Sequence, residues 1–174
     1  AAPGVVAAGD VARWPNARFG GEVMRVEHWD NAIEMAQAAA ARLLAASGES
    51  ALPYEPVPWF WSDLYDRKIQ LAGRSGPDDE VQVVAGDVAE RRFVALYGRS
   101  GRLVGALGWN RPRHIIQWRQ RLVEGMDYAD AVELARSEPL HDLPRLGPAR
   151  PDPGHRRPRL AGQGHRLEAG GVRL

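Results

Sequence analysis

The sequence predicts an α+β fold in which a small antiparallel sheet is covered by helices. Short segments rich in apolar and β-branched residues follow one another in the middle of the chain, separated by turn residues, and this spacing is typical of antiparallel strands. Two segments with helical periodicity come after them, which gives a sheet with helices packed on it. At 174 residues, the chain has room for one domain of ordinary size.

The beginning of the chain is expected to contain two short strands. The apolar run from Val5 to Ala8 indicates a buried strand that ends in a turn at Gly9 and Asp10. As a bare pattern this is an ordinary turn. Residues 14–16 are expected in a loop, and residues 22–26 in a second short strand.

A long helix is expected next, with Asp30 or Asn31 as its N-cap and with Ser47 and Gly48 at its end. Its many alanines allow close packing against a neighbouring element. The N-terminus of such a helix presents unpaired backbone N–H groups and a partial positive charge. His28 lies just before this helix.

An aromatic run organises the rest of the chain. Residues 51–58 contain three prolines and form a stiff connector, at which we place a domain boundary. Trp59, Phe60 and Trp61 follow, and in an extended strand the two indoles share one face while the phenyl ring lies on the other. Two interpretations are open. Either all three rings fill the core between a sheet and a helix, or one face seals the core and the other meets a partner.

The sheet and its helices are expected after this run. Four strands are predicted, over residues 68–73, 80–86, 92–97 and 103–109. A turn at residues 99–101 joins the last two as a hairpin. One helix is expected from Pro112 to Gly125, and a shorter one, capped by Asp127, is expected to run through Ala135.

Composition excludes several classes of protein. The chain has no cysteine, hence no disulfide, thiolate metal site or iron–sulfur ligation of its own. It contains no G-x-G-x-x-G fingerprint, P-loop, H-E-x-x-H zinc pair or nucleophile elbow. No apolar run approaches the roughly 18 residues of a membrane span, and the start lacks a signal-peptide pattern. We therefore expect a cytoplasmic protein with no membrane association.

Residues 139–174 are rich in Arg, Pro and Gly and have no apolar periodicity, so disorder is expected there. Two other interpretations are open. The segment is a basic arm for nucleic acid or another acidic partner, which we disfavour. Alternatively, a shifted reading frame in GC-rich DNA produced it, which the use of arginine almost to the exclusion of lysine favours.

Four short motifs occur in a fixed order along the chain: Ala7-Ala8-Gly9-Asp10, Val26-Glu27-His28-Trp29-Asp30-Asn31-Ala32, Trp59-Phe60-Trp61-Ser62-Asp63 and Asn110-Arg111-Pro112. Together they resemble the C-terminal part of the FAD-dependent NAD(P)H:ferredoxin reductases, the rhodocoxin and putidaredoxin reductase type of the pyridine nucleotide-disulfide oxidoreductase superfamily. The resemblance runs from about residue 1 to about residue 139. It implies a flavoprotein that passes electrons from NAD(P)H through FAD to the [2Fe-2S] ferredoxin of an oxygenase or P450 system.

The resemblance also implies a division of the chain. Residues 1–50 would be a remnant of a Rossmann-like FAD domain, namely its last strand, turn and helix. Residues 51–138 would be the α+β reductase C-terminal domain, and residues 139–174 the tail. In the family, Gly-rich turns upstream of this portion hold the FAD diphosphate and NAD(P)H. We therefore interpret the chain as a fragment, enzymatic only as part of an intact reductase.

The cofactor-contacting residues implied by the resemblance are Gly9, Asp10, Trp29, Asn31, Ala32, Trp61, Ser62 and Asp63. Asp10 would bond the ribityl-phosphate part of FAD, and the helix N-terminus would face the flavin ring. Trp29 would lie at the ferredoxin-facing mouth, its alternative role being a lid on the helix start. We assign no metal site and no catalytic residue, because hydride transfer from nicotinamide to flavin needs no protein base.

Other functions stay open at this point. Flavoproteins related to apoptosis-inducing factor share the pattern from Phe60 to Leu64, which favours a non-catalytic docking or dimerisation module, for which a homodimer is one candidate state. Several ferredoxin reductases have Gln where Leu64 stands. Arg67, Arg74 and Arg111 are candidates for contact with an acidic ferredoxin surface, or are simply solvated.

Overall fold

The computed structural model describes residues 4–45 and 52–137, and these lie in one compact unit of the chain, residues 1–144. Two expectations lie outside the described residues. One is the end of the long helix at Ser47 and Gly48, and the other is the tail over residues 139–174. Among the described helices, none has the length and apolar character needed to cross a membrane.

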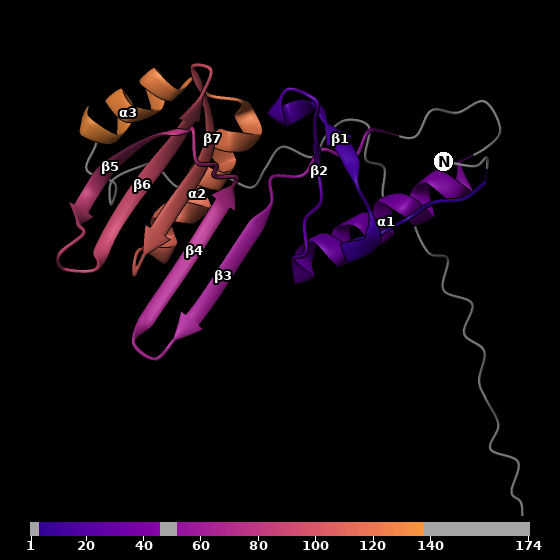
Figure 1. The fold of residues 1–174 in the computed structure, drawn as a ribbon, viewed down its shortest axis with the longest axis horizontal. Helices are drawn as coiled ribbons and strands as arrows, with labels where there is room; N and C mark the ends of the chain where they lie inside the picture. Colours follow the sequence, from indigo (N-terminus) through magenta and orange to yellow (C-terminus); the bar gives the residue numbers. More distant parts are fainter. Residues whose placement is uncertain (1–3, 46–51, 138–174) are drawn as a thin grey trace, which may run out of the picture. The chain divides into compact units, whose positions relative to one another are not determined.

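A five-stranded antiparallel sheet forms the larger part of the structure (Figure 1). In sheet order its strands are β3 (Trp59–Leu64), β4 (Arg67–Gly73), β7 (Arg102–Trp109), β6 (Arg92–Arg99) and β5 (Glu80–Asp87). The four predicted strands are confirmed. The aromatic run is a fifth strand, β3, and it lies at one edge of the sheet, paired with β4 alone.

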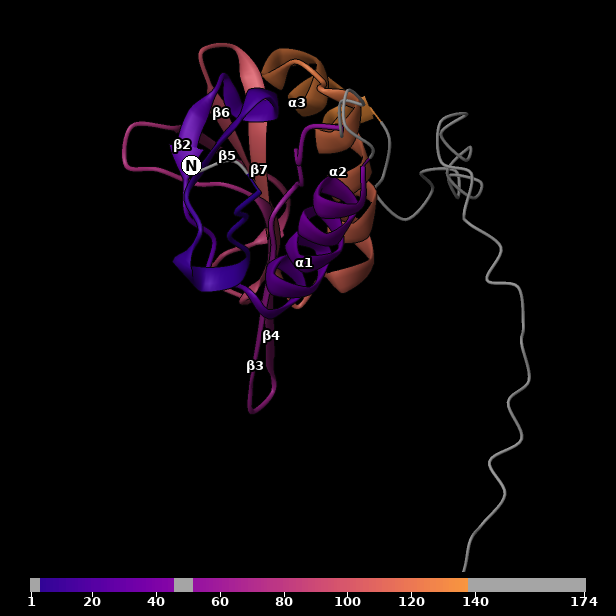
Figure 2. The ribbon, with the colours of Figure 1, turned by 90° about the vertical axis from the view of Figure 1, so that its right-hand side faces the viewer.

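Helices α2 (Pro112–Glu124) and α3 (Tyr128–Ser137) cover one face of this sheet (Figures 1 and 2). Trp118 and Ile115 of α2 are fully buried against Val94 and other apolar side chains of the strands. Close packing requires a glycine at residue 108, because a Cβ atom there would lie 2.4 Å from Cγ1 of Ile115. The predicted α+β fold is therefore confirmed.

The N-terminal part contains a 3-10 turn, η1 (Gly9–Val11), and two short paired strands, β1 (Trp14–Asn16) and β2 (Glu22–Met24). A second 3-10 turn, η2 (Ala17–Phe19), joins them. The loop expected over residues 14–16 is thus wrong. The buried Asn16 side chain explains the strand. Its amide donates to the carbonyl oxygen of Pro56 at 3.0 Å, so β1 is held by a residue that lies 40 positions later in the sequence.

The expected buried strand over residues 5–8 is also wrong. These residues form no strand in the described structure, and Val5 and Val6 are exposed. A strand requires a neighbour for its backbone groups, and none of the described strands pairs with this run. The turn at Gly9 and Asp10 is present as η1.

Helix α1 (Trp29–Leu44) follows β2, with His28 as its N-cap residue. The N-cap expected at Asp30 or Asn31 is therefore wrong. Asn31 is already inside the first turn, where its buried side chain donates to the carbonyl oxygen of Val26 at 3.0 Å. A side chain that reaches back in this way cannot cap the helix.

Candidate functional site

Three of the sequence motifs meet at the N-terminal end of α1. A Cβ atom at Gly9 would lie 3.7 Å from Cβ of Ala32, so the η1 turn lies against the first turns of the helix. The φ angle of Gly9 is +75°, a conformation that favours glycine and lets the turn approach α1. The rings of Trp29 and Trp61 are in contact, with centroids 6.4 Å apart. Four of the expected site residues are thereby brought together.

The N-cap and the first residue of α1 contact the edge strand β3 on both of its faces. The ring of His28 lies 5.7 Å from that of Phe60, centroid to centroid, while the next residue, Trp29, contacts Trp61. Successive residues of a strand point to opposite faces, so these two contacts lie on opposite sides of β3. These aromatic contacts therefore fix the position of the helix start relative to the strand.

Exposure distinguishes the three rings of the aromatic run. Trp59 packs against the core, with the Arg119 guanidinium 5.6 Å from its ring centroid. Phe60 and Trp61 are 40% and 42% exposed, and Trp29 is 72% exposed. The interpretation that all three rings fill the core is therefore wrong. Such an exposed aromatic surface is typical of a site that contacts a ligand or a partner.

The other expected residues lie around this cluster with different surroundings. Asp10 is exposed on η1. Ser62 is partly exposed and pairs across the sheet with Ile69. Asp63, farther along β3, forms an ion pair with Lys68 at 2.8 Å. The structure thus assigns Asp63 a contact within its own hairpin.

Asn31 is only 3% exposed, and both ends of its amide are used internally. Its Nδ2 donates to Val26, and its Oδ1 accepts a hydrogen bond of 3.1 Å from the Tyr54 hydroxyl. The backbone N–H of Asn31 is also engaged, because it donates to Oδ1 of Asp30 at 2.8 Å.

Sequence reasoning missed Tyr54. It lies in the proline-rich connector, which predicted a boundary and nothing more. Burial raises the pKa of the Tyr54 hydroxyl far above its ordinary value, and the negative charges of Glu34 and Asp30 raise it further. The hydroxyl is therefore a neutral hydrogen-bond donor over the whole physiological range.

An ionic cluster joins β2 to the large sheet. Glu22 accepts from Arg99 of β6 at 2.8 Å and pairs with Arg74 at 3.0 Å. Arg99 also donates to Asp79 at 2.6 Å, and the Asp79 side chain is 1% exposed. The hydrogen bond to Asp79 is the largest cause of the raised pKa of Arg99. Arg74, a candidate for contact with an acidic partner, is thus engaged with Glu22.

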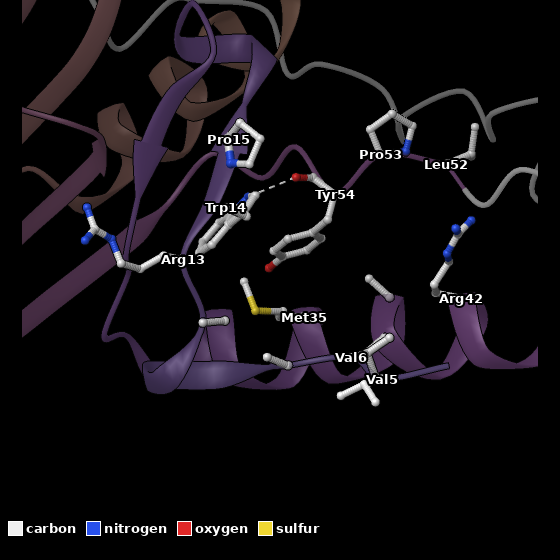
Figure 3. Close-up of a pocket in the computed structure, with 14 residues that line it drawn as sticks. Val5, Val6, Arg13, Trp14, Pro15, Met35, Arg42, Leu52, Pro53 and Tyr54 are labelled. Atoms are coloured by element: carbon white, nitrogen blue, oxygen red, sulfur yellow. Dashed lines mark hydrogen bonds between the residues drawn. The ribbon is translucent and has the colours of Figure 1, made fainter. Parts of the chain in front are cut away.

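A groove of about 490 Å³ runs along α1. Figure 3 shows Trp14 and Tyr54 on one wall and Met35 on the other, with Val5 and Val6 beside the helix. The lining is mainly apolar. The face of α1 that carries Met35, Ala38 and Ala39 therefore leaves room for an apolar segment.

The chemistry of the site comes from aromatic rings and backbone groups. In residues 4–45 and 52–137, no three His, Asp or Glu side chains gather as metal ligands would. The first intrahelical bond of α1 runs from the N–H of Ala32 to His28. Of the N–H groups before it, that of Asn31 donates to Oδ1 of Asp30 at 2.8 Å, which leaves those of Trp29 and Asp30 to meet a group that carries negative charge.

Comparison with known proteins gives a consistent picture. A family model described as "Reductase C-terminal" matches residues 59–143. The chain is 37% identical over 142 residues to the 5,5'-dehydrodivanillate O-demethylase ferredoxin reductase subunit of Sphingobium sp. (strain NBRC 103272 / SYK-6), covering 81% of this chain and 33% of that relative. It is 31% identical over 108 residues to apoptosis-inducing factor 3 of Mus musculus, covering 62% and 17%.

Among solved structures, the covalent putidaredoxin reductase–putidaredoxin complex is similar, with a TM-score of 0.65 and 29% identity. That match covers 78% of this chain and 31% of the solved one. The 174 residues therefore span about a third or less of the length of each of these proteins.

Proposed function

Residues 59–143 belong to the reductase C-terminal family, and on that premise we propose that the chain is the C-terminal part of an FAD-dependent NAD(P)H:ferredoxin reductase. The family resemblance predicted from the four motifs is confirmed by these matches. The activity we propose is electron transfer from NAD(P)H through FAD to the ferredoxin of an oxygenase or P450 system. The observation that carries it is the contact of the exposed Trp29 and Trp61 rings, which joins the helix start to the family domain.

The proposed division of labour has residues 1–50 complete an FAD-binding domain and residues 51–138 form the C-terminal domain. Two observations support it. The first three residues of the apolar run, residues 5–7, are exposed and themselves line the mainly apolar groove along α1. The Sphingobium relative is also about three times as long as the matched part, which leaves room there for nucleotide-binding turns that this chain lacks.

The residues at the start of α1 fit a flavin ring. The N–H groups of Trp29 and Asp30 are left at this end to stabilise negative charge on a bound ring, and Gly9 allows the η1 turn to lie close by. The indoles of Trp29 and Trp61 offer flat apolar surface at the same place. FAD, when bound, supplies the chemistry of accepting a hydride and releasing single electrons. We propose that Asp10 accepts a hydrogen bond from the ribityl-phosphate part.

The partner we propose is a [2Fe-2S] ferredoxin that docks over Trp29 and Trp61. The similarity to a reductase that forms a complex with putidaredoxin supports this class of partner. Aromatic residues are enriched at the centres of protein interfaces, whereas paired surface charges contribute little there. Arg74 is already held by Glu22, so we place it outside this contact.

The test joins the 174 residues to the upstream two thirds of the Sphingobium relative. We expect a yellow protein that reduces a [2Fe-2S] ferredoxin with NADH or NADPH. Replacing Trp61 with Ala should slow ferredoxin reduction at least tenfold, and by a larger factor than it slows reduction of ferricyanide, a small acceptor that needs no docking surface. Equal rates with ferredoxin before and after this replacement would reject the docking surface, and a colourless protein would reject the cofactor assignment.

A second candidate function is a docking or dimerisation module in a flavoprotein related to apoptosis-inducing factor. The match to apoptosis-inducing factor 3 favours it, as does Leu64, which is exposed at the end of β3. This alternative predicts that the chain alone forms a stable dimer, measurable by sedimentation. A monomer at all concentrations would reject it.

A further inference from the structure

We propose that Tyr54 is a positioning residue which, through Asn31, holds the first turn of α1 and the Trp29 ring in place. The inference rests on the proposed function, in which this first turn faces the flavin. It assigns a task to the connector after α1, a segment otherwise explained only as a link between two parts of the chain.

The hydrogen bonds of Asn31 show how the turn is closed. Its Nδ2 donates to the carbonyl oxygen of Val26 at 3.0 Å, which lies before the helix, while Asn31 itself belongs to the first helical turn. This hydrogen bond closes the segment from Val26 to Asn31 and restrains the residues between them, including His28 and Trp29. Because Asn31 is buried, water cannot replace this bond at low cost.

Tyr54 fixes the orientation of the Asn31 amide. Its hydroxyl donates to Oδ1 of Asn31 at 3.1 Å and lies 3.5 Å from the backbone oxygen of the same residue. An amide whose oxygen accepts from Tyr54 must present its NH₂ group to Val26, so the two bonds support each other. The neutral state of the hydroxyl, a consequence of burial and of nearby carboxylates, keeps it a donor.

Tyr54 is in turn held from β1. Nε1 of Trp14 donates to its backbone oxygen at 3.1 Å, and the two rings lie 5.6 Å apart with a 42° tilt (Figure 3). Proline residues on either side of Tyr54 limit the backbone conformations of the connector. A continuous series of contacts thus runs from Trp14 through Tyr54 and Asn31 to the turn that carries Trp29.

The experiment uses the 174-residue chain without cofactor. Tyr54→Phe removes the hydroxyl and keeps the ring, Asn31→Ala removes the amide, and Tyr65→Phe, at a residue that is 99% exposed, is the matched control. The first readout is hydrogen exchange of the Ala32 amide, the first intrahelical donor. The second is the near-ultraviolet circular dichroism signal of the coupled Trp29 and Trp61 rings.

We expect Tyr54→Phe to speed exchange at Ala32 about fivefold, the factor that one ordinary hydrogen bond provides. Exchange in α2 should stay unchanged, the indole signal should weaken, and Tyr65→Phe should have no effect. The double variant Tyr54→Phe/Asn31→Ala should behave as Asn31→Ala alone, because the tyrosine acts through the amide.

Two results would overturn the inference. One is an equal rise of exchange in α1 and α2, which would mean that Tyr54 supports global stability only. The other is an additive double variant, which would mean that Tyr54 does not act through Asn31. Since no flavin is needed, either result leaves the electron-transfer proposal standing. The opposite outcome is also distinguishable. If Tyr54→Phe speeds exchange at Ala32 selectively, but the fusion with the upstream part of the Sphingobium relative is colourless, the proposed function is rejected and the role of Tyr54 stands.

Discussion

The indole rings of Trp29 and Trp61 meet edge to face, with centroids 6.4 Å apart and planes 88° apart. This arrangement is one of the preferred geometries of aromatic pairs, because the positive edge of one ring meets the negative face of the other. It connects the residue that begins α1 to the edge strand of the large sheet. Both rings stay open to a partner, so one contact fixes the site and leaves it accessible.

The contact between these indoles should be measurable as a coupling energy. Trp29→Ala and Trp61→Ala, singly and together, are compared by urea unfolding of the chain. We expect a coupling of about 0.5 kcal/mol, the lower end for aromatic pairs, because both rings are partly hydrated. Trp29→Ala combined with Phe93→Ala, whose ring stacks on Trp109, is the control and should be additive. Additivity in both pairs would contradict the prediction.

Asp79 should carry much of the stability of the ionic cluster. Its buried carboxylate accepts two hydrogen bonds from Arg99 and one from the Gly76 N–H at 2.7 Å. Asp79→Asn keeps the size but loses the charge, and we expect a loss of about 1–3 kcal/mol in the free energy of unfolding. Asp66→Asn, at an exposed ion pair with Arg67, should cost less than about 0.5 kcal/mol. Equal losses in urea unfolding would show that burial of Asp79 adds nothing.

The large sheet could be predicted from the sequence because its signals are local. Turn residues such as those at 99–101 separate apolar segments of strand length, and each strand pairs with a neighbour in the same module. Helix α2 could be predicted equally well, since a proline in its first turn and a glycine after its last turn are both local signals.

The parts that could not be predicted depend on distant partners. β1 has only three residues, and one of them is Pro15, so its sequence does not indicate a strand. Its position is supported by the hydrogen bond from Asn16 to Pro56, which cannot be read from the residues near β1. The bond between Tyr54 and Asn31 is of the same kind. Conversely, residues 5–8 have a good strand pattern but no strand partner among the described residues.

Alkaline pH should destabilise the fold through one buried and two partly buried tyrosines. Burial raises the pKa of Tyr54, Tyr97 and Tyr128 above the ordinary value of 10.0. Above pH 10 the unfolded chain loses these protons while the folded chain keeps them, so stability is full below this pH and falls as the pH rises. The loss is at most about 1.4 kcal/mol per pH unit for each tyrosine.

Urea unfolding at about pH 8 and about pH 11 measures this loss. Tyr54→Phe should lose less stability between the two conditions than the unmodified chain, although it starts from a lower value. A parallel loss in both proteins would show that Tyr54 ionises equally in the folded and unfolded states.

Packing of α2 against the sheet should depend on the missing side chain at Gly108. A Cβ atom there would lie 2.4 Å from Cγ1 and 2.8 Å from Cδ1 of Ile115, which is fully buried and cannot move aside. We expect Gly108→Ala to cost about 1–3 kcal/mol of unfolding free energy, as overpacking does. Ile115→Ala alone should cost about 2–5 kcal/mol through the cavity it leaves. In the double variant the new methyl group occupies part of that cavity, so the combined loss should be smaller than the sum of the two. If the double variant instead loses as much unfolding free energy as the two single variants added together, α2 shifts away from β7 and the glycine is not what sets their separation.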